Sequence, residues 1–287
     1  IAYEWTSNGV DGNNLHRNVI FRDGADKTRN TPPLTTFVSA DPTVPGIDPE
    51  SRWKWLGNWE AKTGGQVLAI PHNGNLSNGQ MFESKRFNGQ PITKQWAEER
   101  ARWEPLVEVF QIKGTSETHP SLSPNDEFAS FGIWDTANLN GVVKKDGDLQ
   151  GEYLREALKT GLRLQTEFGV NPFKYGMAAG SDTHNSLATG GEEGNFWGKF
   201  VADQPSPKRW DHVMFKQQDG FKRLGWTQVA AGITGVWATA NTREALWDAM
   251  KRKGSYASSG PRLSVRFFGG YGSTDKDADA AGPAASG

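Results

Sequence analysis

The sequence predicts an α/β domain in which β-strands alternate with α-helices along the chain. Short, continuous apolar runs such as Gln66–Ile70 are typical of buried strands, whereas Glu152–Phe168 places its apolar residues at helical spacing. The segments between successive strands are too long for hairpins, which favours parallel strands joined by crossover helices, in a barrel or an open sheet. With 287 residues, the chain can bury a sizeable core as one large domain or two small ones.

The strands are predicted from apolar runs and from alternation. A strand end at Ile1–Trp5 precedes a loop rich in Gly and Asn, and the next strand opens at His16. The alternating apolar residues of Leu263–Phe268 predict the last strand. The complete set of predicted strands covers residues 1–5, 16–21, 66–70, 106–112, 175–179 and 263–268.

Helices are predicted where apolar spacing and end signals agree. Pro49–Lys62 ends at a Gly-Gly pair, and Thr242–Lys253 begins with a threonine N-cap. Thr93–Trp103 and Glu152–Phe168 have helical spacing. Long loops are expected in residues 22–50, 113–149 and 185–220, and a disordered tail in 271–287.

The composition excludes several classes of function. A net charge of −1 gives no general electrostatic affinity for nucleic acid or an anionic membrane. The absence of cysteine excludes disulfides, thiolate–metal sites and a cysteine nucleophile, and leaves cytoplasm and periplasm both open. No apolar run approaches the roughly 20 residues that cross a bilayer. Tryptophans could fill the core or line a pocket for a bulky apolar or sugar-like substrate: Trp53, Trp55, Trp59, Trp96, Trp103 and Trp134.

Metal-ligating side chains recur at the predicted strand ends. In Gly180-Ser181-Asp182-Thr183-His184 a carboxylate and an imidazole follow a strand with one residue between them, so in extended backbone both point to the same side. The alternative is an aspartate that caps a turn beside a surface histidine. His72 follows the strand 66–70, Glu4 lies inside an apolar strand where an unpaired carboxylate is costly, and His16 opens the next strand.

Further polar residues are candidates for substrate contacts or extra ligands. His119 and Glu117 lie in the loop after the strand 106–112, and the cations Arg17 and Lys113 could hold an anionic substrate. Solvated surface charge is the alternative for both cations. His212 is interpreted as structural or as a surface residue.

The order of these motifs resembles the later motifs of the PHP (polymerase and histidinol phosphatase) superfamily, and more narrowly the DUF3604 family. The resemblance runs from Ile1 to about Gly270. It rests on Glu4, on His16-x-x-Val19-Ile20-Phe21, on Ile70-Pro71-His72-Asn73-Gly74-Asn75, on Gly180-Ser181-Asp182-x-His184, on Lys113–Glu117, on Thr234–Ala238, on Asn241–Asp248 and on Tyr256–Arg262.

The resemblance implies an incomplete, distorted (β/α)7 barrel of the PHP type, with long loops and a C-terminal strand and helix extension. Residues 1–270 would form the C-terminal part of this barrel domain. The implied metal ligands are Glu4, His16, His72, Asp182 and His184, with Glu4 as the bridging residue and with His72, Asp182 and His184 as the catalytic set. The implied cofactors are divalent Zn, Mn or Fe, two or three in the complete enzyme.

One departure from the superfamily pattern concerns the N-terminal motifs. The expected His-x-His and Asp-His motifs would precede Glu4, and the chain contains no His-x-His. We therefore interpret the chain, which opens inside a strand without an initiator Met, as a fragment whose partners include a missing N-terminal segment of the same protein. Its exposed strand edges would also favour pairing with a second copy, as a homo-oligomer.

The predicted function is metal-dependent hydrolysis of a small anionic ester, first of all a phosphate ester. Two alternatives remain: a metal-dependent ester or amide hydrolase of another class, and a catalytically degenerate barrel that serves as a binding module.

Overall fold

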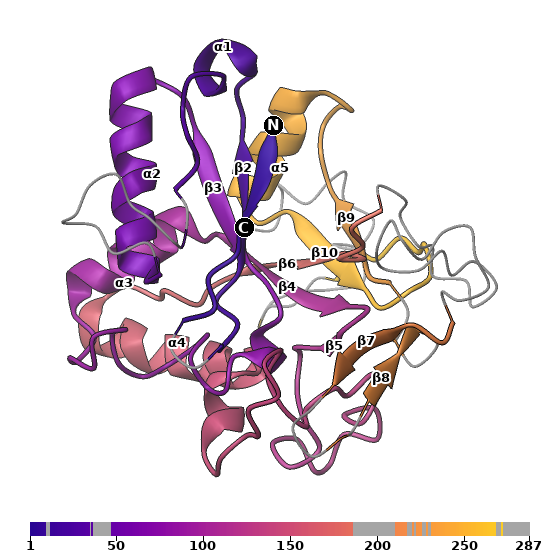
Figure 1. Cartoon of the computed structure of the whole chain (residues 1–287). Coiled ribbons are helices and arrows are strands. Elements are labelled where there is room, and N and C mark those ends of the chain that lie inside the picture. Colours follow the sequence, from indigo (N-terminus) through magenta and orange to yellow (C-terminus); the bar gives the residue numbers. More distant parts are fainter. Residues whose placement is uncertain are drawn as a thin grey trace.

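The computed structural model describes residues 1–9, 12–34, 36, 47–185, 210–216, 220, 222–225, 228, 231–267 and 271. The described chain is a mixed α/β structure, as predicted (Figure 1). Its helices are α1 (Ala25–Thr28), α2 (Pro49–Thr63), α3 (Lys94–Trp103), α4 (Leu154–Phe168) and α5 (Arg243–Lys251), with 3₁₀ turns η1 (Gly74–Leu76) and η2 (Asp148–Gly151). Its strands are β1 (Ala2–Trp5), β2 (Arg17–Phe21), β3 (Val67–Pro71), β4 (Leu106–Gln111), β5 (Gly114–Thr115), β6 (Gly176–Ala179), β7 (Val213–Lys216), β8 (Lys222–Leu224), β9 (Ile233–Val236) and β10 (Ser255–Ser258).

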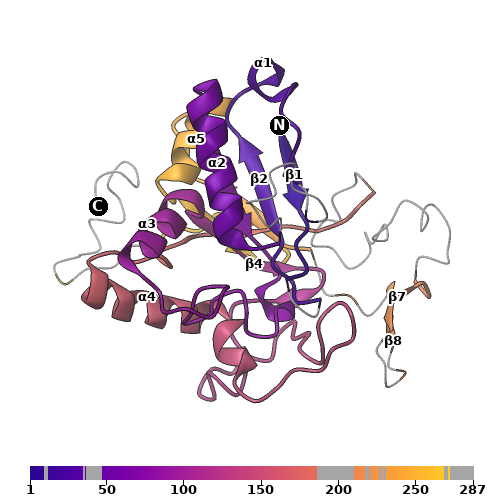
Figure 2. The same cartoon turned by 60° about the vertical axis from the view of Figure 1, so that its left-hand side comes forward.

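These strands form four small sheets. One has the order β1-β2-β3 and another the order β5-β4-β6, and β9 pairs with β10 and β7 with β8. β3 lies beside β4, and β6 lies beside β9 and β10, although no ladder joins these neighbours. Helices α2, α3 and α4 gather on one side of β1 and β2, and β7 and β8 lie on the other side (Figure 2). The strands of the described segments do not close into a barrel.

The expectation of parallel strands is wrong for the first sheet. β4 and β6 are parallel, but β1 pairs antiparallel with β2, and β2 pairs antiparallel with β3. The long connections that suggested crossovers therefore return the chain in the opposite direction. As a result, the start of β2 lies at the same end of the sheet as the carboxyl ends of β1 and β3, with Trp5, Arg17 and Pro71 in one row.

The main helices begin and end where their local chemistry predicts. Asp48 caps α2 by accepting a hydrogen bond from the Ser51 backbone N–H at 2.8 Å, and Pro49 occupies the first helical position. Gly64 ends the helix in the left-handed conformation, with φ of 62°. The side chains of Thr93 and Thr242 cap α3 and α5 in the same way as Asp48. The four predicted helices are thus confirmed, with ends that differ by a few residues.

Most of the tryptophans fill the core. Trp53, Trp59, Trp96 and Trp103 are buried in one apolar cluster with Trp5 and residues of α2, α3 and β3. Trp134 is also buried, and Trp55 packs partly buried against the cluster. A buried ion-pair network crosses this core: Glu104 accepts hydrogen bonds from Arg17 Nε at 3.0 Å and from Trp53 Nε1 at 2.8 Å.

The C-terminal part of the prediction needs correction. Residues 263–267 form no strand, and β9 and β10 pair instead. Leu263, Val265 and Phe267 do alternate, but they are 46%, 40% and 90% exposed and face no partner sheet. Of the tail predicted to be disordered, residues 272–287 lie outside the described residues. No helix in the described ranges is long and apolar enough to cross a membrane.

Candidate metal centre

Three of the predicted ligands come from one end of the first sheet. Glu4 lies on β1 opposite Asn18, which is two residues from His16, so Glu4 and His16 project from the same face of the sheet. His72 directly follows β3, and its backbone N–H donates to the His16 carbonyl at 3.2 Å, which extends the β2–β3 ladder by one pair. The antiparallel register therefore brings all three side chains together.

One carboxylate oxygen joins the two imidazoles. His16 Nδ1 lies 2.9 Å from Glu4 Oε1, and His72 Nε2 lies 3.2 Å from the same atom. The two rings meet edge to face with their centroids 5.6 Å apart. Both histidines are buried, and Glu4 is partly accessible. This geometry offers one oxygen and two nitrogen donors toward a common point.

The electrostatics of this group favour the cation-binding protonation states. Burial alone would raise the pKa of Glu4, but its hydrogen bonds with His16 and His72 hold that pKa well below the usual range. Burial lowers the pKa of His16 to about 4, against the opposing effect of its hydrogen bond with Glu4. At neutral pH the site therefore combines an anionic carboxylate with a neutral His16, which are the ionisation states that ligate metals.

A second group shares Glu4 with the other predicted pair. Glu4, Asp182 and His184 offer ligand atoms that all lie within 4.8 Å of one another, as do those of Glu4, His16 and His72. Asp182 Oδ1 lies 3.6 Å from His184 Nε2, and Oδ2 is ion-paired with Lys113 from the tight turn between β4 and β5. The structure thus brings together all five residues that the strand-end pattern predicted.

The backbone at Asp182 differs from the expected one. An extended chain was predicted through Asp182 and His184, but Asp182 has a positive φ of 52°. Asn73, directly after His72, has the same φ. Non-glycine residues in this left-handed region are uncommon and cluster at functional sites, because the local strain has to be held by the surrounding structure.

Three of the four remaining predicted contacts have partners outside the two groups. Arg17 is fully buried and bound to Glu104. Both ring nitrogens of His119 have hydrogen-bond partners. Nε2 lies 2.7 Å from Asp135 Oδ2, and Nδ1 accepts from the Ser121 N–H. Glu117 forms an ion pair with Arg155. Of the four additional candidates, only Lys113 contacts a ligand of the cluster.

Two site residues escaped the sequence reasoning. Asn8 lies in the loop after β1, and its Oδ1 is 3.0 Å from His16 Nε2. Glu108 is a buried carboxylate on β4 whose Oε1 accepts from the Asn73 N–H and from Gln111 Nε2. Burial raises the pKa of Glu108. Glu108 could have been found by the argument applied to Glu4, a carboxylate inside an apolar strand, whereas nothing distinguishes Asn8 from the other loop asparagines.

The donor set fits a borderline transition metal. Imidazole nitrogens and carboxylate oxygens without thiolates suit Zn, Mn or Fe. Each group provides three protein donors, which leaves coordination positions for water or substrate. His72 Nδ1 is buried and finds no hydrogen-bond partner among the described residues, so one polar atom of the imidazole–carboxylate cluster is left unsatisfied there.

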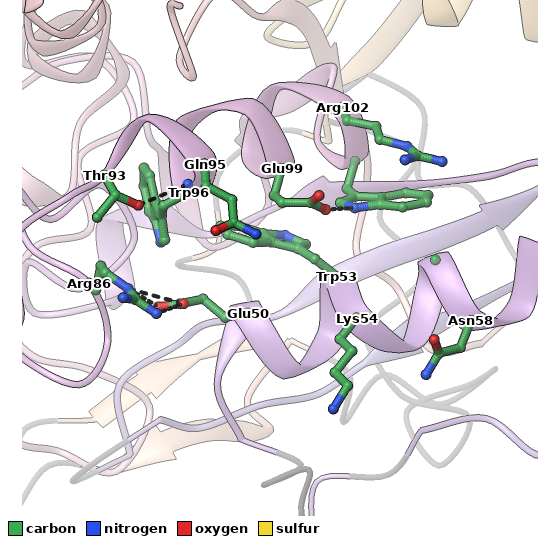
Figure 3. A pocket seen from close by; sticks show the side chains of 12 residues that line it. Glu50, Trp53, Lys54, Asn58, Arg86, Thr93, Gln95, Trp96, Glu99 and Arg102 are labelled. Carbon is green, nitrogen blue, oxygen red and sulfur yellow. Dashed lines mark hydrogen bonds and ion pairs between the residues drawn. The ribbon is translucent and has the colours of Figure 1, made fainter. Parts of the chain in front are cut away.

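The groove between α2 and α3 contrasts with this cluster (Figure 3). It has a volume of about 430 Å³, and Trp53, Trp96 and Trp103 are among the residues that line it. Both carboxylates that line it are engaged with neighbours: Glu50 pairs with Arg86, and Glu99 accepts from Trp103 Nε1 at 2.6 Å. None of the predicted metal ligands or substrate-contacting polar residues lines this groove, whereas three of the tryptophans predicted either to fill the core or to line a pocket do.

Comparison with known proteins gives one match. The family model described as "Protein of unknown function (DUF3604)" matches residues 1–287. No curated protein and no solved structure matches the chain.

Proposed function

Since the chain belongs to the DUF3604 family, a family without an assigned function, we propose from its own residues that it is a metal-dependent hydrolase. One observation carries the proposal: donor atoms from the ends of four strands, distant in sequence, form two groups that share Glu4. Hydrogen bonds between Glu4 and the two buried histidines offset the desolvation of these groups only in part, and a bound cation would offset more of it.

The finer assignment is a phosphoesterase of the PHP type. The resemblance of the motif order to that superfamily supports it, with Glu4 in the bridging role between the His16–His72 pair and the Asp182–His184 pair. In this proposal the strands β1–β4, β6, β9 and β10 are parts of a distorted barrel. The succession of neighbouring strands, from β1 through β2, β3, β4 and β6 to β9 and β10, is compatible with such an arrangement.

Charge at the site supports an anionic substrate. Glu4 and Asp182 contribute −2 and Lys113 contributes +1, a sum of −1 when His16, His72 and His184 are neutral. Two divalent cations would bring the site to +3, which favours a phosphate ester over a neutral amide or carboxylic ester. Lys113 lies beside Asp182 and is placed to neutralise an additional anionic oxygen.

The chain's own residues have distinct parts in this proposal. Glu4, His16 and His72 would hold one cation, and Glu4, Asp182 and His184 would hold the other. Metal ions of this kind, when bound, polarise a phosphoryl oxygen and lower the pKa of a water to near neutrality. Lys113 holds Asp182 Oδ2, so that Oδ1 faces His184. The alternative is a binding module that holds metal without catalysis, and the experiment has to distinguish it from a hydrolase.

The test is metal content followed by hydrolysis. The chain, and a version extended at its N-terminus, would be reconstituted with Zn²⁺ or Mn²⁺, and bound metal would be measured by elemental analysis. We expect bound metal in wild type and about half of that metal content in His184→Ala, together with cleavage of p-nitrophenyl phosphate but not of p-nitrophenyl acetate by wild type. Absence of metal from both lengths of chain would overturn the proposal. Metal without any ester cleavage would leave a metal-binding module.

A further inference from the structure

We propose that Asn8 is a positioning residue for His16: its amide pairs with Nε2 whether or not that nitrogen carries the proton, and so allows Nδ1 to give up its proton and ligate a cation. This inference rests on the proposed metal centre. Its basis is the placement of the His16 ring between two partners, Glu4 Oε1 at 2.9 Å from Nδ1 and Asn8 Oδ1 at 3.0 Å from Nε2.

The first step concerns the metal-free protein. An ionised Glu4 can only accept hydrogen bonds, so its contact with Nδ1 requires a proton on Nδ1. A neutral imidazole has a single N–H, so Nε2 then carries a lone pair and needs a donor. The Asn8 side chain supplies that donor when its amide turns by half a rotation, because the amide nitrogen and oxygen then exchange places.

The second step concerns the cation-bound protein. A cation between His16 and Glu4 needs the lone pair of Nδ1, so the ring proton has to reside on Nε2. Nε2–H then needs an acceptor, and Asn8 Oδ1, in the orientation that the structure has, provides it. An amide can therefore serve both proton positions from the same place, which neither a carboxylate nor an apolar side chain can do.

The backbone beside Asn8 is anchored, although Asn8 itself is exposed. The adjacent Ser7 is buried, its carbonyl accepts from the Leu15 N–H at 2.9 Å, and its hydroxyl accepts from the Gly9 N–H at 3.3 Å. Asn14 Oδ1 accepts from the His16 N–H at 3.0 Å, which fixes the backbone on the other side of the ring. His72 differs, because its second ring nitrogen has no such partner within the described part of the chain.

The experiment has two independent readouts. Long-range ¹H–¹⁵N NMR would locate the proton on the His16 ring in the metal-free full chain and after addition of Zn²⁺. Competition with a chromophoric chelator would give the dissociation constant for Zn²⁺. The variants are Asn8→Leu, which removes both hydrogen-bonding functions, and Asn8→Asp, which can only accept. Asn58→Leu, an exposed asparagine on α2, is the matched control.

The expected results follow from the two steps. In wild type the proton resides on Nδ1 without metal and on Nε2 with Zn²⁺. Metal-free Asn8→Asp instead carries a proton on Nε2 in addition to the one on Nδ1, because the carboxylates on both sides of the ring can only accept. Asn8→Leu weakens Zn²⁺ binding by about 10- to 100-fold, the usual effect of removing a partner behind a metal-ligating histidine, and Asn58→Leu leaves it unchanged.

Three results would overturn the inference: a wild-type proton on the same nitrogen in both states, Asn8→Asp with the wild-type proton position, or Asn8→Leu with wild-type affinity. If wild type binds no Zn²⁺, the proposed metal centre fails. The metal-free proton positions in wild type and Asn8→Asp would still decide whether Asn8 controls the His16 ring.

Discussion

Glu4 is the residue on which both ligand groups depend, since its carboxylate belongs to each of them. We expect Glu4→Gln to lose both cations, because the amide keeps the size of the side chain but removes the charge that binds them. His184→Ala should lose only the cation of the second group, which would lower the metal content by half. Elemental analysis after reconstitution measures the difference directly.

Glu98→Gln is the control for this comparison, because Glu98 is an exposed carboxylate on α3 in a surface pair with Lys94. It should keep the full metal content. Equal losses in Glu4→Gln and His184→Ala would contradict a shared Glu4 and would point to a single cation bound by one of the groups.

Glu152 gives the fold a pH dependence of its own. It is fully buried, and burial raises its pKa to about 7 although Lys144 lies 2.5 Å away. Between its ordinary pKa of 4.5 and about 7 the folded state binds more protons than the unfolded state. The free energy of unfolding therefore falls as the pH rises through this interval, by roughly 3 kcal/mol at most.

Glu152→Gln should flatten this dependence, because the amide does not titrate and its oxygen can still accept from Lys144. Urea unfolding of both proteins at pH 5 and pH 8 measures it, and the quantity to compare is the difference between the two pH values in each protein. A Glu152→Gln protein that loses as much stability as wild type between pH 5 and pH 8 would assign the dependence to other groups.

The predictable site residues are those with metal-ligand chemistry at a strand end. Glu4, His72 and Asp182 could be found because burying a carboxylate or imidazole beside an apolar strand costs free energy unless a partner such as a cation compensates it. Asn8 could not, because an asparagine in a Gly-rich loop is ordinary turn chemistry. The prediction for Arg17 fails for a different reason. Its charge suggested a substrate contact, but it pairs with Glu104, which lies 87 residues away in the sequence and so could not be identified as its partner from a local pattern.

At the scale of elements, Glu104 connects three of them. It follows α3 and accepts from Arg17 just inside β2 and from Trp53 on α2, and its Oε2 lies 3.3 Å from Arg100 Nε on α3. The positive charges hold the pKa of Glu104 below its usual range against the effect of burial. Glu104 is therefore ionised and forms buried ion pairs with the two arginines.

Glu104→Ala should destabilise the protein by about 3–5 kcal/mol, because it leaves two buried guanidinium groups without their carboxylate. Glu98→Ala, in an exposed pair on the same helix, should cost less than about 1 kcal/mol. Urea unfolding at one pH compares the two variants. A Glu104→Ala protein as stable as Glu98→Ala would mean that water replaces the lost carboxylate in the core.

Helices were more predictable than strand direction, for a physical reason. The ends of α2, α3 and α5 are set by nearby side chains, such as the Asp48 and Thr93 caps, so a short stretch of sequence contains the information. The direction in which two strands pair depends on contacts between distant segments. The long connection from β2 to β3 accommodates an antiparallel return as easily as a parallel crossover, so its length does not determine the direction of β3.

At the scale of the whole molecule, the candidate metal centre lies where two sheets meet. β3 runs beside β4 without a hydrogen-bonded ladder between them. Glu4, His16 and His72 belong to the first sheet, whereas Asp182 and Lys113 follow strands of the second. A cation held by Glu4 and Asp182 would therefore join two sheets that otherwise meet through side-chain packing.

This position predicts that metal binding stabilises the fold. A ligand that binds only the folded state at 100 times its dissociation constant raises the free energy of unfolding by about 2.7 kcal/mol. Zn²⁺ should therefore raise the melting temperature of wild type, and EDTA should reverse the change, whereas Glu4→Gln should respond to neither. Calorimetry with and without Zn²⁺ measures the shift. Hydrogen exchange separates a cross-link from a local effect: slower exchange in both β3 and β6 indicates joined sheets, whereas slower exchange in β3 alone confines the cation to the first group.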